Sequence, residues 1–240
     1  MLRSKEEEFY LECEKRWVFS TLMFVGGFYG VFTFAIRGGV FCNAQTGNFV
    51  FMAMALGEGD FAEALYYFVP MAAYLLGTIV SELVPRPVKR THIIRWDTLL
   101  ILIEMIAVIL LGFVPETAPY QISQVTINFL CSMQYNTFRQ AEGVPMATTF
   151  CTNHVRQIGI AISNTVRKGS REEYRSRLLI HIRMLTFFVV GGMFAAVLCN
   201  LFRGKAIWAA LIPLTAVFIG LLYADRIKEQ EYIEETPRGH

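Results

Sequence analysis

Residues 17–36 read WVFSTLMFVGGFYGVFTFAI and contain no charged side chain. As an α-helix with a rise of about 1.5 Å per residue, this stretch is about 30 Å long, which matches the hydrocarbon core of a bilayer. The whole chain has 240 residues, of which 54% are hydrophobic and 18% charged, and its mean hydropathy is +0.42. This composition excludes an ordinary soluble enzyme, and the uncharged stretch predicts a membrane-spanning helix.

Further apolar runs of similar length follow along the chain, at 64–81, 98–114, 120–138, 184–202 and 206–224. Two shorter runs, 46–56 and 152–162, begin with small or polar residues and are too short to cross a bilayer easily. The sequence therefore predicts an all-α polytopic membrane protein. We expect one membrane domain over 1–240, with six transmembrane helices and two half-helices that are re-entrant or broken.

The distribution of Lys and Arg favours half-helices that turn back within the membrane. In that arrangement every Lys and Arg lies on the side of the two termini, except Arg37, Arg203 and Lys205. If both half-helices span instead, Arg156 is left in the bilayer. Short cytoplasmic loops are enriched in Lys and Arg, so we expect both termini in the cytoplasm. The acidic start of the chain lacks the features of a signal peptide, which predicts that the first span stays in the mature protein.

The two half-helices also indicate an internal repeat. Placing Thr46 on Thr152 superposes QTGNFVFMAMAL on CTNHVRQIGIAI, and it brings the other spans of the two halves into the same order. Repeat one covers about 17–114 and repeat two about 120–224, with an insertion near 167–177. Each unit crosses the membrane three times, so the second must be inverted relative to the first. Many secondary transporters and some channels have this plan.

Several motifs resemble those of a known family. They are GGFYG at 26–30, RGGVFCNAQTGN at 37–48, GEGD at 57–60 and ATTFCTNHVRQIG at 147–159. With them the chain resembles the YoaK-like family (DUF1275) of bacterial multi-pass membrane proteins of unknown function. The resemblance implies a compact protein of the bacterial inner membrane, and it supplies neither substrate nor activity. Family members often carry a TG turn in the second half, where this chain has Thr152 followed by Asn153 and His154.

The start of each half-helix is the predicted substrate site. A helix that begins inside a membrane exposes its first N–H groups, which protein, water or a ligand must satisfy. Thr46 is expected to cap the first half-helix, and two positive helix ends near the midplane favour an anion or polar solute. The alternative is that these polar residues only cap the helices and join the repeats. The predicted binding residues are Gln45, Thr46, Gly47, Asn48, Thr152, Asn153 and His154.

Ionisable and polar residues inside apolar runs are costly and often functional. Glu104, near the centre of 98–114, predicts proton coupling, with a structural hydrogen bond as the alternative. Arg156 is expected to attract an anion, or else to extend to the cytoplasmic face. In the polar run 120–138, Gln124 and Asn128 share a helix side with Gln121 and Ser132. That side either lines a polar path with the binding residues or packs against other helices.

A transporter of a small solute, expected to be a small anion or organic acid, explains these features together. The alternatives are a channel and a non-transporting assembly or sensor subunit, in which the basic segment 167–183 binds a partner or anionic lipid. Outside that last alternative, we expect 167–183 to be a solvated basic loop on the cytoplasmic side. An intramembrane enzyme built on Glu142, Cys151 and His154 lacks the spacing of known sites, so we do not expect an enzyme. The net charge of +2 without a basic face argues against nucleic acid, and the five cysteines predict no metal, cofactor or disulfides. The small chain suggests a homodimer in the bilayer.

Overall fold

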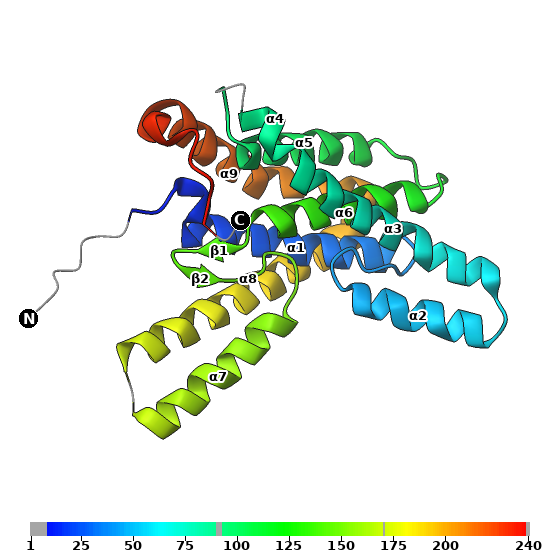
Figure 1. The fold of residues 1–240 in the computed structure, drawn as a ribbon. Helices are drawn as coiled ribbons and strands as arrows, with labels where there is room; N and C mark the ends of the chain where they lie inside the picture. Colours follow the sequence, from blue (N-terminus) through cyan, green and yellow to red (C-terminus); the bar gives the residue numbers. More distant parts are fainter. Residues whose placement is uncertain (1–8, 90–92, 170, 239–240) are drawn as a thin grey trace, which may run out of the picture.

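The computed structural model describes residues 9–89, 93–169 and 171–238 (Figure 1). Arg3, Lys5 and Arg90, which the topology argument counts as cytoplasmic, lie outside these residues. Within them the chain is helical apart from one small ribbon. Its helical elements, in chain order, are η1 (Glu12–Glu14), α1 (Arg16–Ile36), α2 (Gln45–Gly57), α3 (Phe61–Leu83), α4 (Pro85–Lys89), α5 (Trp96–Gly112), α6 (Gln121–Thr137), α7 (Thr152–Lys168), α8 (Glu172–Phe202), η2 (Arg203–Ala210), α9 (Leu211–Tyr223), η3 (Ala224–Lys228) and η4 (Gln230–Tyr232).

The small ribbon pairs β1 (Gln140–Ala141) with β2 (Val144–Pro145) in antiparallel register. Its turn residues, Glu142 and Gly143, have φ values of 45° and 78°. Two consecutive positive φ values are typical of a type I′ hairpin turn, which matches the twist of the flanking strands. The sequence analysis did not predict this ribbon, but the fold is otherwise all-α as expected.

Among the described residues, three helical segments are long and apolar enough to cross a membrane: Arg16–Ile36, Phe61–Leu83 and the continuous segment Glu172–Lys228. The helices α5 and α6 each have 17 residues, about 25 Å at 1.5 Å per residue. Apolar helices of these lengths are compatible with a membrane protein.

The long helices pack in two similar pairs. α1 lies along α8, and α3 lies along α6. Glycines allow the close approach in both pairs. A Cβ atom on Gly191 of α8 would lie 2.0 Å from the Phe24 carbonyl oxygen of α1, and one on Gly77 of α3 would lie 2.4 Å from the Phe129 carbonyl oxygen of α6. The main apolar core lies between these pairs, α5 and α9, and includes Leu100.

The two half-helices form hairpins that point in different directions. α2 pairs with α3 and extends to the right of Figure 1, whereas α7 pairs with α8 and extends to the lower left. α2 begins at Gln45 after Ala44, and no side chain caps it within the described residues, so the prediction that Thr46 is its N-cap is wrong.

α7 is longer than predicted, because it continues to Lys168 instead of ending near 162. α8 starts at Glu172, so most of the segment 167–183 is helical, and the expectation of a basic loop there is wrong. The acidic pair Glu172 and Glu173 in the first turn of α8 suits a helix N-terminus, which explains why the helix starts at this point.

Both ends of the described chain meet at one end of the molecule. The Arg238 backbone N–H donates to Glu14 Oε1 at 2.6 Å, and Arg238 Nη2 donates to the Phe9 carbonyl at 3.3 Å. Beneath them, buried Arg95 lies 3.0 Å from Glu229 Oε2 and 3.6 Å from Asp225 Oδ1. The charged groups of this region therefore hold the termini together.

Candidate functional site

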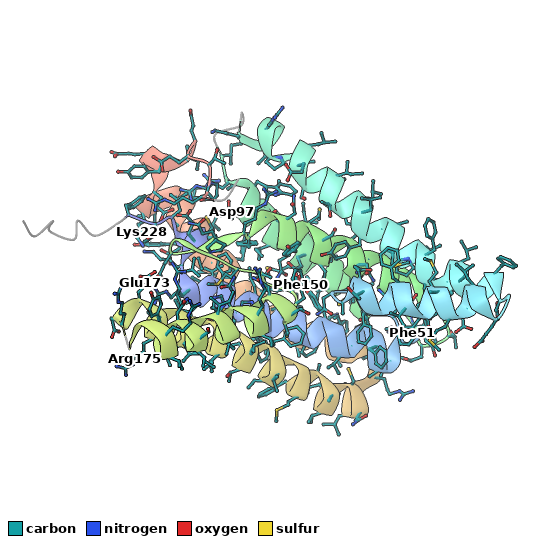
Figure 2. The ribbon with its side chains drawn as sticks, turned by 60° about the horizontal axis from the view of Figure 1, so that its bottom comes forward. Phe51, Asp97, Phe150, Glu173, Arg175 and Lys228 are labelled. Atoms are coloured by element: carbon teal, nitrogen blue, oxygen red, sulfur yellow. The ribbon has the colours of Figure 1, made fainter. Side chains whose placement is uncertain are left out.

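A cavity of about 710 Å³ lies where the two half-helices begin. It is bounded by α1, by the starts of α2 and α7, and by one side chain each from α3 and α8. Figure 2 shows Phe150, in the segment before α7, near the middle of the molecule. The lining residues are Gly27, Gly30, Val31, Phe34, Ala35, Phe41, Asn43, Ala44, Gln45, Thr46, Tyr74, Phe150, Cys151, Thr152 and Phe188.

Three of the predicted binding residues, Gln45, Thr46 and Thr152, line this cavity together. They come from the first turns of α2 and α7, which are far apart in sequence. Gly47, Asn48, Asn153 and His154 do not line it. The structure therefore brings the two half-helix starts to one place, as predicted, but turns several of the expected side chains away from the cavity.

Asn48 holds the loop that precedes α2. Its Oδ1 accepts from the Phe41 backbone N–H at 3.0 Å, and its Nδ2 donates to the Phe41 carbonyl at 2.7 Å. Nδ2 also lies 3.1 Å from Gln45 Oε1. Asn48 is fully buried, so these bonds satisfy backbone groups that water does not reach. Its side chain holds Phe41, which lines the cavity, and does not itself face the cavity.

His154 has the corresponding place in the first turn of α7. Its Nε2 lies 3.0 Å from the Ala147 carbonyl, seven residues earlier in the chain, and its Nδ1 lies 2.9 Å from His181 Nδ1 of α8. A carbonyl can only accept, so Nε2 carries the proton. In the neutral ring Nδ1 is then an acceptor, and His181 donates to it. His154 thus ties the loop, α7 and α8 together.

The polar residues of α6 also bind the first loop. Gln124 Nε2 donates to the Arg37 carbonyl at 2.7 Å and to the Tyr66 hydroxyl at 2.5 Å. Gln45 Nε2 donates to Asn128 Oδ1 at 2.8 Å. Both α6 residues are fully buried, and neither lines the cavity. This side of α6 therefore contacts the start of α2 and the loop before it, and among the described residues it does not line the cavity.

Glu104 and Arg156 also lie away from the cavity lining. Glu104 is fully buried in α5, where its carboxyl faces the Tyr29 hydroxyl of α1. Arg156 is exposed on α7. Tyr29 is one residue before Gly30, which lines the cavity. Glu104 is therefore connected to the cavity through α1 and not by direct contact.

Charged side chains are absent from the cavity lining among the residues that the structure describes. Buried Arg37 lies at the far end of α1, where its Nη2 is 3.7 Å from Glu116 Oε1. The same described part of the chain contains no group of three His, Cys, Asp or Glu side chains that could hold a metal ion. The cavity can therefore offer aromatic faces, hydroxyls and amides to a ligand.

A comparison with protein families identifies the chain. The family described as "Protein of unknown function (DUF1275)" matches residues 18–220, which is most of the sequence. The chain belongs to the DUF1275 family. Searches of curated proteins and of solved structures found no match to this DUF1275 protein.

The sequence analysis of this DUF1275 protein missed the aromatic lining of the cavity. Phe41 and Phe150 each lie a few residues before a half-helix, and Tyr74 and Phe188 come from the long helix that follows it. An aromatic residue ahead of both half-helices is a signal that could have been read. The sequence gives no comparable signal for Tyr74 and Phe188, because aromatic residues are common throughout the apolar runs.

Proposed function

We propose that this protein is a membrane transporter for a small solute and that the 710 Å³ cavity is its solute site. The observation that carries the proposal is the meeting of two half-helix starts at one cavity, since transporters of this plan bind substrate between discontinuous helices near the midplane. The proposal includes six membrane crossings, two inverted repeats and an inner-membrane location with cytoplasmic termini.

Matching contacts in the two halves support inverted repeats. Asn48 and His154 both donate to a carbonyl seven residues earlier. The first helix of repeat one, α1, packs on α8 of repeat two, and the first helix of repeat two, α6, packs on α3 of repeat one. A pseudo-two-fold axis that relates the repeats requires such a reciprocal pair of contacts. The hairpin of α2 with α3 likewise corresponds to that of α7 with α8. Duplication followed by inversion explains all three correspondences.

Alternating access would use these pairs as the moving parts. The cavity lies against both α1 and α8, which approach through Gly27 and Gly191. Small residues at a helix crossing allow one helix to slide or rock on the other without large side-chain rearrangement. A change at this crossing alters the cavity wall directly, whereas a channel would keep one continuous wet path.

Glu104 is the proposed coupling residue. Its carboxyl lies near the Tyr29 hydroxyl in the interior, and neither group has a hydrogen-bond partner among the described residues, so protonation of Glu104 removes a buried charge that nothing there compensates. Tyr29 is on the helix that carries Gly27 and Gly30. Proton uptake at Glu104 can therefore bias the position of α1. Glu104→Gln is expected to remove the dependence of uptake on a proton gradient, with Glu63→Gln, an exposed carboxyl of α3, as the control.

Solute flux into sealed proteoliposomes tests the proposal. Ala35 lines the cavity, so Ala35→Leu fills part of it without adding a polar group. The matched variant Ala196→Leu changes an exposed position of α8 outside the lining. We expect flux of at least one small organic solute, at least a 10-fold loss in Ala35→Leu and little change in Ala196→Leu. Absence of flux for every small anion, organic acid and neutral solute would move the function to an assembly or sensor subunit.

A further inference from the structure

We propose that the cavity binds a small aromatic solute, built on a single ring with one polar group, and not a small inorganic anion. This inference rests on the proposed function, because it names the class of solute for that same cavity. Three properties of the cavity carry it: its volume, the rings in its lining, and the few polar groups that remain free there.

The volume is far larger than a small ion requires. A water molecule occupies about 30 Å³ in the liquid, and sites for drug-sized ligands are about 300–1,000 Å³. At about 710 Å³ the cavity belongs to the second class. A nitrate or chloride ion bound there would keep most of its water and touch only one wall. The size therefore favours an organic molecule.

The rings of the lining give the cavity flat faces. Phe34 and Phe41 are stacked with centroids 4.4 Å apart and an angle of 16° between their planes. Phe150 packs against Tyr135, with centroids 4.7 Å apart, and is thereby held in place from behind. Phe188 and Tyr74 contribute further rings from two long helices. Fixed aromatic walls of this kind favour a planar ring through stacked or edge contacts.

Most of the polar lining is already used within the protein. Asn43 Nδ2 donates to the Gly26 carbonyl at 3.0 Å, and Gln45 bonds to Cys42, Asn48 and Asn128. In the described part of the chain, the hydroxyls of Thr46 and Thr152 have no hydrogen-bond partner. These two hydroxyls, one from each half-helix, can serve one polar group of a solute.

The absence of charge also limits what can bind. Without a charged residue among the described lining, a compact anion would find no ion pair there, and it would keep most of its water instead of contacting the walls. A ring with a hydroxyl, amide or carboxyl group keeps its polar end at Thr46 and Thr152 and buries the ring.

Equilibrium binding to the full-length protein in lipid nanodiscs tests the inference with a matched series of probes. Benzamide is compared with cyclohexanecarboxamide, which keeps the polar group but loses the aromatic ring, and with acetamide, which has no ring. Benzoate tests an ionised polar group, nitrate a small anion, and decanoate a lipid chain. We expect benzamide or benzoate to bind about 2- to 10-fold more tightly than the saturated ring, and acetamide and nitrate to bind far more weakly.

Variants connect that binding to the cavity. Phe188→Leu removes one wall and should weaken benzamide binding about 2- to 10-fold, while Ala35→Leu should weaken it at least 10-fold. Phe61→Leu, at an exposed position of α3, should leave it unchanged. Circular dichroism and unfolding temperature show whether each variant is folded, and a second wall variant, Phe150→Leu, replaces Phe188→Leu if the latter does not fold.

Failure of this inference differs from failure of the proposed function. If nitrate or acetamide is carried with Ala35-dependent flux while no ring compound binds, transport stands and the aromatic class is overturned. Tighter binding of decanoate than of any ring compound would assign the cavity to a lipid chain and overturn the inference. Absence of both flux and binding for every probe would overturn the two together.

Discussion

The loops that precede α2 and α7 are closed by the same bond but by different side chains. Asn48 Nδ2 donates to the Phe41 carbonyl at 2.7 Å, and His154 Nε2 donates to the Ala147 carbonyl at 3.0 Å. Asn48 also accepts from the same Phe41 backbone, so the first loop is closed locally. His154 instead contacts His181 of α8. The bond to a carbonyl seven residues earlier is common to both loops, while the second loop also depends on a neighbouring helix.

This difference shows which parts of the two loops can vary. A buried carbonyl must have a donor, so that position is restricted to side chains that can supply one. The other contacts of that side chain can differ between the two loops. The first half uses an amide, which does not titrate near neutral pH, and the second uses an imidazole, which can. The two loops therefore share one hydrogen bond, and only the side chain that makes it in the second loop can respond to pH.

The largest effect is expected where the two halves pack. A Cβ atom on Gly27 would lie 2.0 Å from the Phe188 carbonyl oxygen, so Gly27→Ala must separate α1 from α8. Overpacking of a core typically costs about 1–3 kcal/mol, and a clash with backbone falls at or above the upper end. We expect the free energy of unfolding in detergent micelles to fall by at least about 3 kcal/mol. The free energy of unfolding should fall by a similar amount in Gly77→Ala, at the corresponding α3–α6 crossing.

Gly159→Ala is the control for these glycine variants. A Cβ atom at Gly159 of α7 meets no atom within 4 Å, apart from the backbone of its own helix. Replacing an exposed helical glycine by alanine stabilises a helix by about 0.5–1 kcal/mol, so this variant should be as stable as the parent or slightly more stable. If Gly27→Ala behaves like Gly159→Ala, the close crossing of α1 and α8 is wrong.

The next effect is expected at the locally closed loop. Asn48→Ala leaves the Phe41 N–H and carbonyl without partners in a partly buried place, and each unpaired group costs about 1–3 kcal/mol when fully buried. We expect the free energy of unfolding to fall by about 2–3 kcal/mol. Chemical denaturation in micelles measures it. Asn153→Ala, in the first turn of α7, is the matched control because its side chain makes no hydrogen bond within the described part of the chain, and it should change stability by less than about 0.5 kcal/mol.

The sequence was sufficient to predict the elements that depend on periodicity and composition. The uncharged run 17–36 became α1, and the polar side of α6 with Gln124 and Asn128 is buried. The sequence also placed both half-helix starts together. These features follow from hydrophobic burial and from the cost of exposing polar groups to lipid, which local sequence reports directly.

The sequence was not sufficient for contacts that depend on tertiary packing. The direction of Asn48 and His154 away from the cavity, the pairing of His154 with His181, and the aromatic wall of Phe188 all require the relative positions of α7 and α8. The start of α8 at Glu172 was missed because a basic run was taken for a loop. Residue type alone does not distinguish a donor to a ligand from a donor to backbone.

The third long helices of the two halves differ in charge, and pH should reveal this. α5 begins with Trp96 and Asp97, whereas Leu211–Tyr223 of α9 is uncharged. Burial raises the pKa of the Asp97 carboxyl from 3.8 to about 6, although Arg95 opposes this. Folding therefore takes up a proton between these pH values. The contribution of protonated Asp97 to the free energy of unfolding is fully present below about pH 4, and it is lost as the pH rises through about 6.

Asp97→Asn should remove this part of the pH dependence. We expect the loss of unfolding free energy between pH 5 and pH 8 to be smaller in the variant by about 1–2 kcal/mol. Unfolding in micelles at both pH values measures it. Glu58→Gln, at the exposed turn between α2 and α3, controls for the loss of one negative charge. If the free energy of unfolding depends on pH as strongly in Asp97→Asn as in the parent protein, another group is responsible for that dependence.

The smallest effect is expected when the second loop is given the side chain of the first. His154→Asn keeps a donor for the Ala147 carbonyl and loses the contact with His181, so it should cost about 1 kcal/mol. His154→Ala removes both and should cost about 2–3 kcal/mol. Unfolding of both variants in parallel gives the difference between them.

The outcome of this pair decides whether the two loops are equivalent. If asparagine restores most of the stability that alanine loses, the bond to the carbonyl seven residues earlier is the common requirement of both halves. If asparagine is as harmful as alanine, the contact with His181 is what holds α7, and the likeness of the two loops is limited to their backbone. The His181→Ala variant then distinguishes the cases, because it leaves the Ala147 bond of His154 intact and should destabilise the protein only in the second case.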